Sequence, residues 1–336
     1  MSGEAPPIEI APRRRFVISG TNTGLGALLI ALVIVFTLII GDNFFSTEVL
    51  RSMALQLPEL GILSLAMMIT LLAGGINLAI IATANLCALT MAYVLNTFVP
   101  GTEGILWIAW LVAAVLAGLA VAAVIGLING TVIAYLGVSP ILATLGTMTM
   151  VKGISVGLTR GTVLSGFPEP IVFIANGLVF GVPFSLFVFF ACAIPLAVIL
   201  SRTPFGNSIY MLGSNLEATR FSGVRTRRTT MKIYVLSSLL AGVAAVVMMS
   251  RFNSANASYG ESYLLVTILA AVLGGIDPFG GFGKVSGLVL SLIILQVISS
   301  AFNLIGLSQF LTLAIWGTLL IATSVVALIY RARISR

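Results

Sequence analysis

Apolar residues run in long stretches along this chain, and short segments rich in polar and charged residues separate them. A helix that crosses a bilayer needs about 20 mostly apolar residues. On that criterion the pattern predicts ten spans, near residues 24–41, 57–76, 78–98, 105–136, 140–158, 183–201, 230–250, 262–276, 285–305 and 309–330. The chain is therefore expected to be an all-α integral membrane protein, a polytopic bundle of about ten transmembrane helices.

Two of these stretches depart from a regular crossing, and a third is shorter still. The fourth is overlong, so we expect its helix to end before Tyr135. The eighth, 262–276, is short for a full crossing, which predicts short or broken helices near a pathway. Residues 171–181 form an apolar stretch that is either re-entrant or interfacial.

The segments between the spans are too short to fold alone. The largest is the basic loop 202–229, and residues 1–23 contain three prolines and are expected to form a flexible tail. We therefore expect a cytoplasmic tail at 1–23, a single transmembrane domain at 24–330 and a cytoplasmic C-terminus at 331–336.

Composition supports a membrane protein, since 59% of the residues are hydrophobic and 8% are charged, against about 25% charged in soluble domains. The net charge of +7 does not indicate nucleic-acid binding, because 13 of the 17 basic residues lie at 13–15, 202–232, 284 and 331–336. An even number of spans separates these clusters, which puts them on one side. The positive-inside rule makes that side, with both termini, cytoplasmic. The apolar composition makes membrane lipid the expected surrounding partner.

Catalysis and cofactor binding have little support in the composition. Histidine is absent, and the two cysteines, Cys87 and Cys192, lie far apart within apolar segments. Neither a metal site nor a disulfide framework is expected from them. An intramembrane enzyme is therefore disfavoured, and no cofactor is predicted.

Small residues recur every four positions in the fourth span, at Gly118, Ala122, Gly126 and Gly130. Such faces let helices approach closely in lipid, either within one chain or at a seam between subunits. The stretches 74–77 (GGIN) and 274–277 (GGID) also resemble each other. Corresponding interruptions in two halves point to a transport pathway, but chance or a shared turn requirement explains four residues equally well.

A few polar side chains within the spans are candidates for lining a solute pathway. Lysine within a membrane costs about 2.5–3.5 kcal/mol on insertion scales, so Lys152 should face a cavity or a partner. Threonines can instead bond their own helix backbone. The candidate pathway residues are Asn77, Asn85, Asn129, Thr144, Thr147, Lys152, Gln296 and Asn303.

The loop after the sixth span contains a pattern typical of a capped helix. Ser214 is the expected N-cap and Glu217, three residues later, completes a capping box. Leu216 and Phe221 supply the apolar positions, and Gly223 suits the C-terminal end. With Asn215 and Arg220, these residues form either a helix that docks into a groove of a partner or a basic loop that only sets orientation.

The chain shows no energy source of its own. Gly283-Lys284 resembles the end of a phosphate-binding loop, but Pro278 and Val285 stand where that motif needs glycine and serine or threonine. Buried acidic residues of the kind found in proton-coupled pumps are not evident. We therefore expect another subunit to supply the energy.

Taken together, the motifs resemble the permeases of ATP-binding-cassette sugar importers of the ribose, xylose and arabinose type, within the branched-chain amino acid and ribose permease family. The resemblance runs from about residue 55 to 328. It is carried by the stretches 72–79 (LAGGINLA), 126–134 (GLINGTVIA), 140–153 (PILATLGTMTMVKG), 203–223 (TPFGNSIYMLGSNLEATRFSG) and 270–287 (AAVLGGIDPFGGFGKVSG).

The resemblance implies a bacterial inner-membrane importer. It would contain two permease chains, identical or paralogous, with cytoplasmic ATPase subunits and a periplasmic or lipid-anchored solute-binding protein. It also implies that residues 213–223 contact the ATPase. Asn77 departs from the family pattern, which has aspartate there. The expected function is uptake of a sugar or sugar-like polyol by a non-hydrolysing permease, and the alternative is a stand-alone secondary transporter or channel for a small polar solute.

Overall fold

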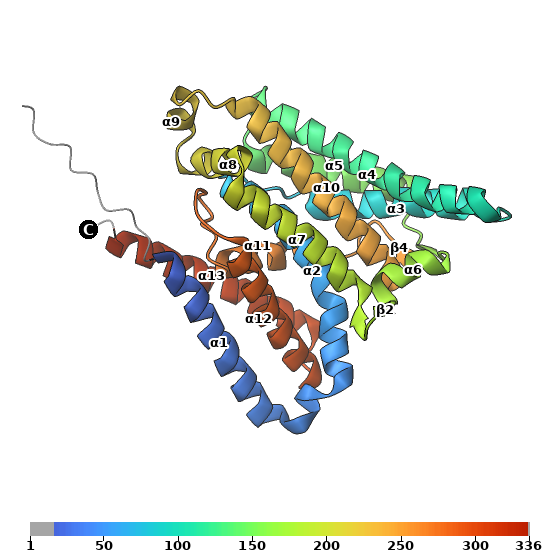
Figure 1. Ribbon diagram of the computed structural model, residues 1–336, viewed down its shortest axis with the longest axis horizontal. Coiled ribbons are helices and arrows are strands. Elements are labelled where there is room, and N and C mark those ends of the chain that lie inside the picture. Colours follow the sequence, from blue (N-terminus) through green and yellow to red (C-terminus); the bar gives the residue numbers. More distant parts are fainter. Residues whose placement is uncertain (1–16, 335–336) are drawn as a thin grey trace, which may run out of the picture.

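The chain folds into a helical bundle in which each predicted span corresponds to a helix (Figure 1). The computed structural model describes the backbone of residues 17–334 and the side chains of 22–41 and 44–325. The ten helices at the predicted spans are α1 (Val17–Ile40), α2 (Thr47–Leu72), α3 (Ile80–Phe98), α4 (Gly104–Ala134), α5 (Pro140–Thr159), α7 (Phe184–Arg202), α10 (Thr226–Phe252), α11 (Tyr263–Leu273), α12 (Val285–Leu304) and α13 (Gln309–Ile334). The predicted all-α membrane fold is confirmed.

Eight of the described helices are long and apolar enough to cross a membrane. Helix α11 has only 11 residues, which at about 1.5 Å per residue covers roughly half of a ~30 Å hydrocarbon layer. The short helix expected in the eighth span is therefore present. Helix α4 ends at Ala134, as expected.

Some element boundaries differ from the expected ones. Helix α1 begins at Val17, so residues 17–23, assigned to the flexible tail from their sequence, are helical. Helix α2 begins at Thr47, before the expected start at 57, because the Ser46 side chain accepts a hydrogen bond from the Val49 N–H and caps it. Pro58 lies inside this helix and does not start it.

Short elements connect the long helices. Residues 171–181 fall in helix α6 (Glu169–Asn176) and the hairpin of β2 (Leu178–Val179) with β3 (Val182–Pro183). Strand β1 (Leu164–Ser165) pairs antiparallel with β4 (Ser254–Ala255), which joins the segments after α5 and α10. The remaining short elements are the 3-10 helix η1 (Gly41–Phe45), α8 (Pro204–Ser214) and α9 (Leu216–Phe221).

Helix α10 is largely buried and packs against α2, α3 and α4. Small residues permit this approach: a Cβ on Gly126 would lie 2.7 Å from Val235 Cα, and one on Gly130 would lie 2.9 Å from Met231 Cα. Gly118 lies in the same way against the Met91 side chain of α3. The glycine face of α4 therefore packs within this chain, which is the first of the two interpretations left open by the sequence.

Candidate coupling surface and solute pathway

The break between α2 and α3 is held by buried polar contacts. Asn77 is fully buried; its Nδ2 donates to Ser237 Oγ at 3.0 Å and its Oδ1 accepts from the Ala79 N–H at 3.1 Å. Thr144 Oγ1, from α5, accepts the Leu78 N–H at 3.1 Å. Asn77 and Thr144 are therefore buried within the bundle and hold the break between α2 and α3 in place.

Asn85, Asn129 and Thr147 are also buried in contacts between elements. Asn85 Nδ2 donates to the carbonyl oxygens of Ala257 and Tyr259, at 3.1 and 2.9 Å, and ties the segment after α10 to α3. Thr147 Oγ1 donates to Asn129 Oδ1 at 2.6 Å, joining α5 to α4. Asn129 Nδ2 has no hydrogen-bond partner among the described residues.

Lys152 meets a charged partner, as its place in a span required. Its Nζ lies 2.8 Å from Glu261 Oε1, and the two side chains are 46% and 52% exposed. The hydrogen bond from Lys152 holds the pKa of the Glu261 carboxyl below its ordinary value. Helix α5 buries only one narrow stripe, so this ion pair lies on a face that the described chain leaves uncovered.

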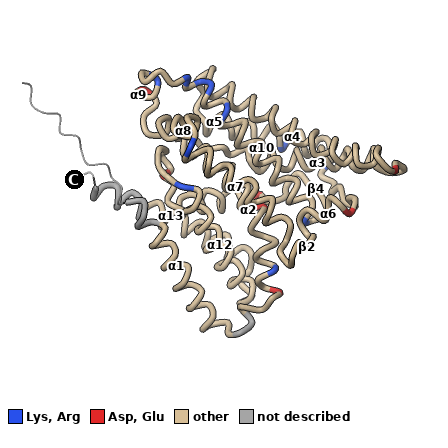
Figure 2. Tube along the Cα trace, viewed as in Figure 1, with Lys and Arg blue, Asp and Glu red and all other residues tan. Residues whose placement is uncertain are grey.

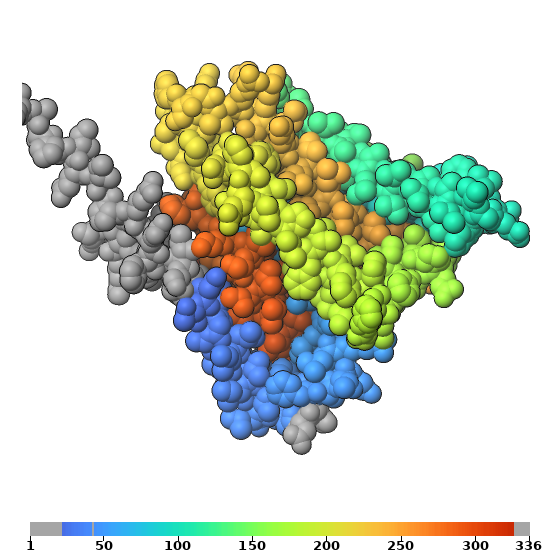
Figure 3. All heavy atoms as spheres, in the orientation of Figure 1, coloured from blue at the N-terminus to red at the C-terminus, as the bar shows by residue number. Residues whose placement is uncertain are grey.

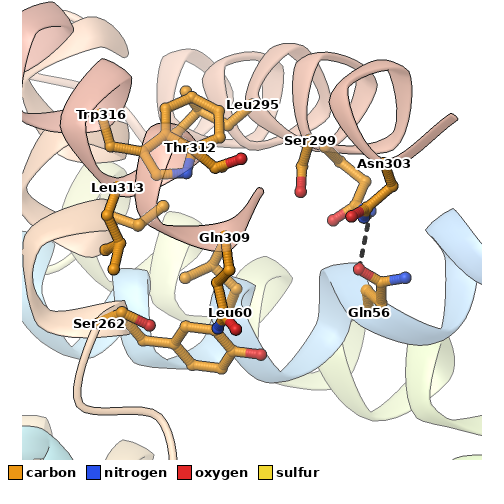
Figure 4. Close-up of a pocket in the computed structure, with 13 residues that line it drawn as sticks. Gln56, Leu60, Ser262, Leu295, Ser299, Asn303, Gln309, Thr312, Leu313 and Trp316 are labelled. Carbon is orange, nitrogen blue, oxygen red and sulfur yellow. Dashed lines mark hydrogen bonds between the residues drawn. The ribbon is translucent and has the colours of Figure 1, made fainter. Parts of the chain in front are cut away.

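Gln296 and Asn303 meet at a cavity of about 270 Å³ between α2, α11, α12 and α13 (Figure 4). Gln56 and Gln309 bring two more amide side chains to it. Of the eight predicted pathway residues, these two alone line this cavity. The others lie elsewhere in the bundle.

A buried ion pair was missed from the sequence. Glu59, inside α2, is fully buried and pairs with Arg251 from the last turn of α10. The Tyr263 hydroxyl donates to the same carboxylate oxygen at 2.6 Å. The expectation that the spans lack buried acidic residues is therefore wrong. Glu59 was overlooked because the apolar run around it resembles an ordinary span; a single acid within such a run was the available signal.

The capped helix in the loop after α7 exists, but its expected cap is wrong. Ser214 is the last residue of α8, while Asn215 has an extended backbone and its Oδ1 accepts the Ala218 N–H at 2.9 Å. Asn215 is therefore the N-cap of α9, and Glu217 falls one position too early for a capping box. Gly223, with φ +81°, follows the helix as expected.

Helix α8 is bound tightly to the ends of other segments. A Cβ on Gly213 would collide with the Leu72 carbonyl oxygen and the Gly281 nitrogen. The Gly281 N–H itself donates to Leu72 O at 2.9 Å, and Tyr210 Oη donates to Gly283 O at 2.9 Å. The end of α2, the end of α8 and the turn at 280–283 therefore meet at one point, with room only for glycine.

The two resembling stretches are matching helix-ending turns. Gly74 (φ +78°) follows α2 and Gly275 (φ +81°) follows α11. The next N–H bonds back five residues in each case, from Gly75 to Thr70 and from Ile276 to Ala271. The turns therefore match with a shift of one residue from the sequence alignment, which favours a shared turn requirement.

Basic residues gather at this same end of the molecule. Figure 2 shows Lys and Arg near α8, α9 and the start of α10, while acidic residues mark the far ends of α4 and α6. Helix α9 presents Phe221 at 89% exposure and Leu216 at 57%. In Figure 3 residues of α8 and α9, in yellow, form one corner of the surface. We call Leu216–Phe221 with its neighbours Asn215 and Gly223 the α9 surface.

These features define a multi-pass helical permease, with membrane-crossing helices, broken helix ends and an exposed surface at one end. Residues 49–324 match the family described as the branched-chain amino acid transport system / permease component. The chain belongs to this family, so the resemblance drawn from its motifs is confirmed.

Curated relatives agree with this assignment. The chain is 29% identical over 309 residues to the autoinducer 2 import system permease protein LsrD of Photorhabdus laumondii, covering 90% of this chain and 89% of that protein. It is 29% identical to LsrD of Salmonella typhi (94% and 92% covered) and 30% identical to LsrD of Yersinia enterocolitica (90% of each). No solved structure matches the chain significantly.

Proposed function

We propose that this chain is the non-hydrolysing permease subunit of an importer that moves a sugar or sugar-like polyol into the cytoplasm. A separate ATP-binding-cassette subunit hydrolyses the ATP, and a periplasmic or lipid-anchored protein delivers the solute. The family match and the relatives named as import permeases support the class. The α9 surface carries the proposal, because it is exposed and helix α8 links it to the broken helix ends.

The exposed apolar side chains of α9 fit a protein groove. Phe221 is 89% exposed beside Arg220, and an aromatic ring in a pocket is a common anchor of protein interfaces. Helix α8 connects this surface to Leu72 and Gly281 through the close contact at Gly213. Movement of a docked ATPase would therefore reach the ends of α2 and of the 280–283 turn.

A second permease chain, identical or paralogous, is proposed to cover α5. The Lys152–Glu261 pair is about half exposed although Lys152 lies within a span. A charge facing lipid there is costly, whereas a partner chain or a water-filled pathway between two chains removes that cost. Gly153 and Gly157 have nothing within 4 Å of an added Cβ, so this face also has room for a close neighbour.

We also propose that both termini are cytoplasmic, in the inner membrane of a bacterium, with residues 24–330 as one domain and 202–229 as the coupling loop. Most of the described basic residues gather at the α8–α9 end, which the positive-inside rule makes cytoplasmic. Reporter fusions at both ends test this orientation. Activity of a periplasmic reporter at either end would contradict it.

The docking role is tested with Phe221→Asp in the complete transporter. A charge in an apolar groove is strongly unfavourable, so co-purification of the ATPase and solute uptake should both fall sharply. Membrane abundance should stay normal because no span is altered. Normal ATPase binding and normal uptake would refute the docking role and leave a loop that only sets orientation.

A matched pair tests the helix itself. Asn215→Ala removes the observed cap and should cost about 0.5–2 kcal/mol of helix stability, which weakens ATPase binding moderately. Ser214→Ala, one residue earlier, removes no cap bond and serves as the control. Equal effects of the two substitutions would show that the cap of α9 does not matter for docking.

A further inference from the structure

The cavity between α2, α11, α12 and α13 has an unusual chemical character for the interior of a membrane protein. Four of its lining side chains are amides, from Gln56, Gln296, Asn303 and Gln309, and hydroxyl groups from Ser299 and Thr312 accompany them. Of the described residues that line it, none is charged. Amides and hydroxyls both donate and accept hydrogen bonds, as the hydroxyl groups of a polyol do.

The Gln296 amide is held loosely enough to exchange partners, whereas Gln56 Nε2 keeps a 2.8 Å bond to Ser52 Oγ and leaves its Oε1 for a solute. Gln296 is 6% exposed, and its Nε2 lies 3.4 Å from Gln56 Oε1 and 3.3 Å from Ser300 Oγ. Both distances lie beyond the usual 2.7–3.2 Å range. Figure 4 shows Gln56 on α2 facing Ser299 and Asn303 on α12 across this space, with the Gln296–Gln56 bond dashed. A solute hydroxyl between the two helices would find better-placed partners than they find in each other.

One wall of the cavity is aromatic. Trp316 is 5% exposed and its ring lies against Phe302, with ring centroids 6.1 Å apart. Tyr263 also lines the cavity, but its hydroxyl is already bonded to Glu59 at 2.6 Å, so it offers mainly its ring. An apolar face beside convergent polar groups is typical of small-molecule sites and matches a sugar ring with C–H groups on one side.

The cavity lies toward the end of the bundle opposite α9. Gln56 belongs to the first half of α2, whose last residue, Leu72, contacts the α8–α9 segment. Asn303 lies near the end of α12, which begins just after the turn that contacts α8. At about 270 Å³ the volume is close to the lower limit of ~300–1,000 Å³ for small-molecule pockets.

We propose that this cavity binds a neutral, polyhydroxylated solute, with Gln296, Gln56 and Asn303 bonding its hydroxyls and Trp316 covering its apolar face. The inference deepens the proposed function, on which it rests, by placing a solute site in one permease chain and naming its selectivity. A charged solute lacks a counter-charge there, because the neighbouring Glu59 is committed to Arg251.

The test is equilibrium binding to the full-length chain in lipid nanodiscs, without ATPase, followed by tryptophan fluorescence. The chain has three tryptophans, so Trp107→Phe with Trp110→Phe leaves Trp316 as the reporter. The probes are ribose, xylose, arabinose and myo-inositol, with ribose 5-phosphate and gluconate as charged counterparts. We expect saturable binding of at least one neutral probe and none of the charged probes.

Two variants link the signal to the cavity. Gln296→Leu should weaken binding by about three- to tenfold, the effect of one neutral hydrogen bond or slightly more. Thr312→Val, a near-isosteric change at the cavity, should weaken it less. Thr318→Val is the matched control, since Thr318 lies in the same helix, also bonds the carbonyl four residues back and does not line the cavity.

No saturable signal from any neutral probe, or binding unaffected by both cavity variants, would overturn the assignment. Equal binding of neutral and charged probes would also overturn it. These results are separable from failure of the proposed function, which is judged by ATP-dependent uptake in the complete transporter. Uptake that persists without binding to the isolated chain would refute the cavity site alone.

Discussion

Removal of Arg251 should destabilise this protein more than any other single charge deletion in the described bundle. Glu59 is fully buried, and Arg251, with a side chain 21% exposed, is its charged partner. Arg251→Met leaves the carboxylate with one hydrogen bond, from Tyr263. Its second oxygen, Oε2, already lacks a partner among the described residues.

The size of the effect follows from burial. Breaking a buried ion pair by removing one partner typically costs about 3–5 kcal/mol, whereas replacing both partners with apolar residues is often neutral or stabilising. Arg251→Met should therefore destabilise by about 3–5 kcal/mol, and Glu59→Leu with Arg251→Met should recover most of that loss. At ~2–4 °C per kcal/mol, the single variant should melt at least about 6 °C lower.

The two cysteines allow the melting temperature to be measured in purified protein. Cys87 is buried and Cys192 is half-buried, and both thiols are free, so a thiol-reactive dye reports their exposure on heating. The melting temperatures of wild type, the single variant and the double variant are then ranked. A single variant as stable as wild type, or a double variant less stable than the single one, would refute the reasoning.

Other predictions concern helix contacts and charge. Gly213→Ala should disrupt the meeting point of α2, α8 and the 280–283 turn and lower both stability and uptake. Gly153→Ala, with open space around it, should leave the stability of the isolated chain unchanged. Equal melting temperatures of these two variants would contradict this. The hydrogen bond from Lys152 lowers the pKa of Glu261 in the folded chain. The pair therefore stabilises the fold at pH values above the ordinary glutamate pKa, and this contribution is lost as the pH falls through the lower folded pKa. The melting difference between wild type and Glu261→Gln should therefore be small, given the exposure of the pair, and should vanish on acidification; a difference that grows at low pH would contradict the assignment.

Most of the helical architecture was predictable because membrane spans depend on a simple quantity, the length of an apolar run. The ten helices and the end of α4 before Tyr135 follow from it. Local capping was harder, because Ser214 and Asn215 are both good N-caps and only the backbone bend between α8 and α9 decides between them. Sequence spacing alone does not carry that information.

The candidate site was predictable only in part. The sequence identified Gln296 and Asn303 as polar residues in spans, but not the cavity they share with Gln56 and Gln309, because helix register across four separate segments decides which side chains converge. Asn77 and Asn85 looked similar in sequence, yet their amides bond neighbouring segments within the protein. Packing between distant segments separates these two roles.

The central claim is that this chain transports only when an ATPase is docked at the α9 surface, and reconstituted uptake tests it most directly. Vesicles would contain the permease alone, or the permease with its ATPase and binding protein, and the uptake of a labelled polyol would be measured with and without ATP. We expect uptake only in the complete, ATP-supplied system, and loss of it with Phe221→Asp. Concentrative or facilitated flux by the permease alone would contradict the account and identify a stand-alone transporter or channel.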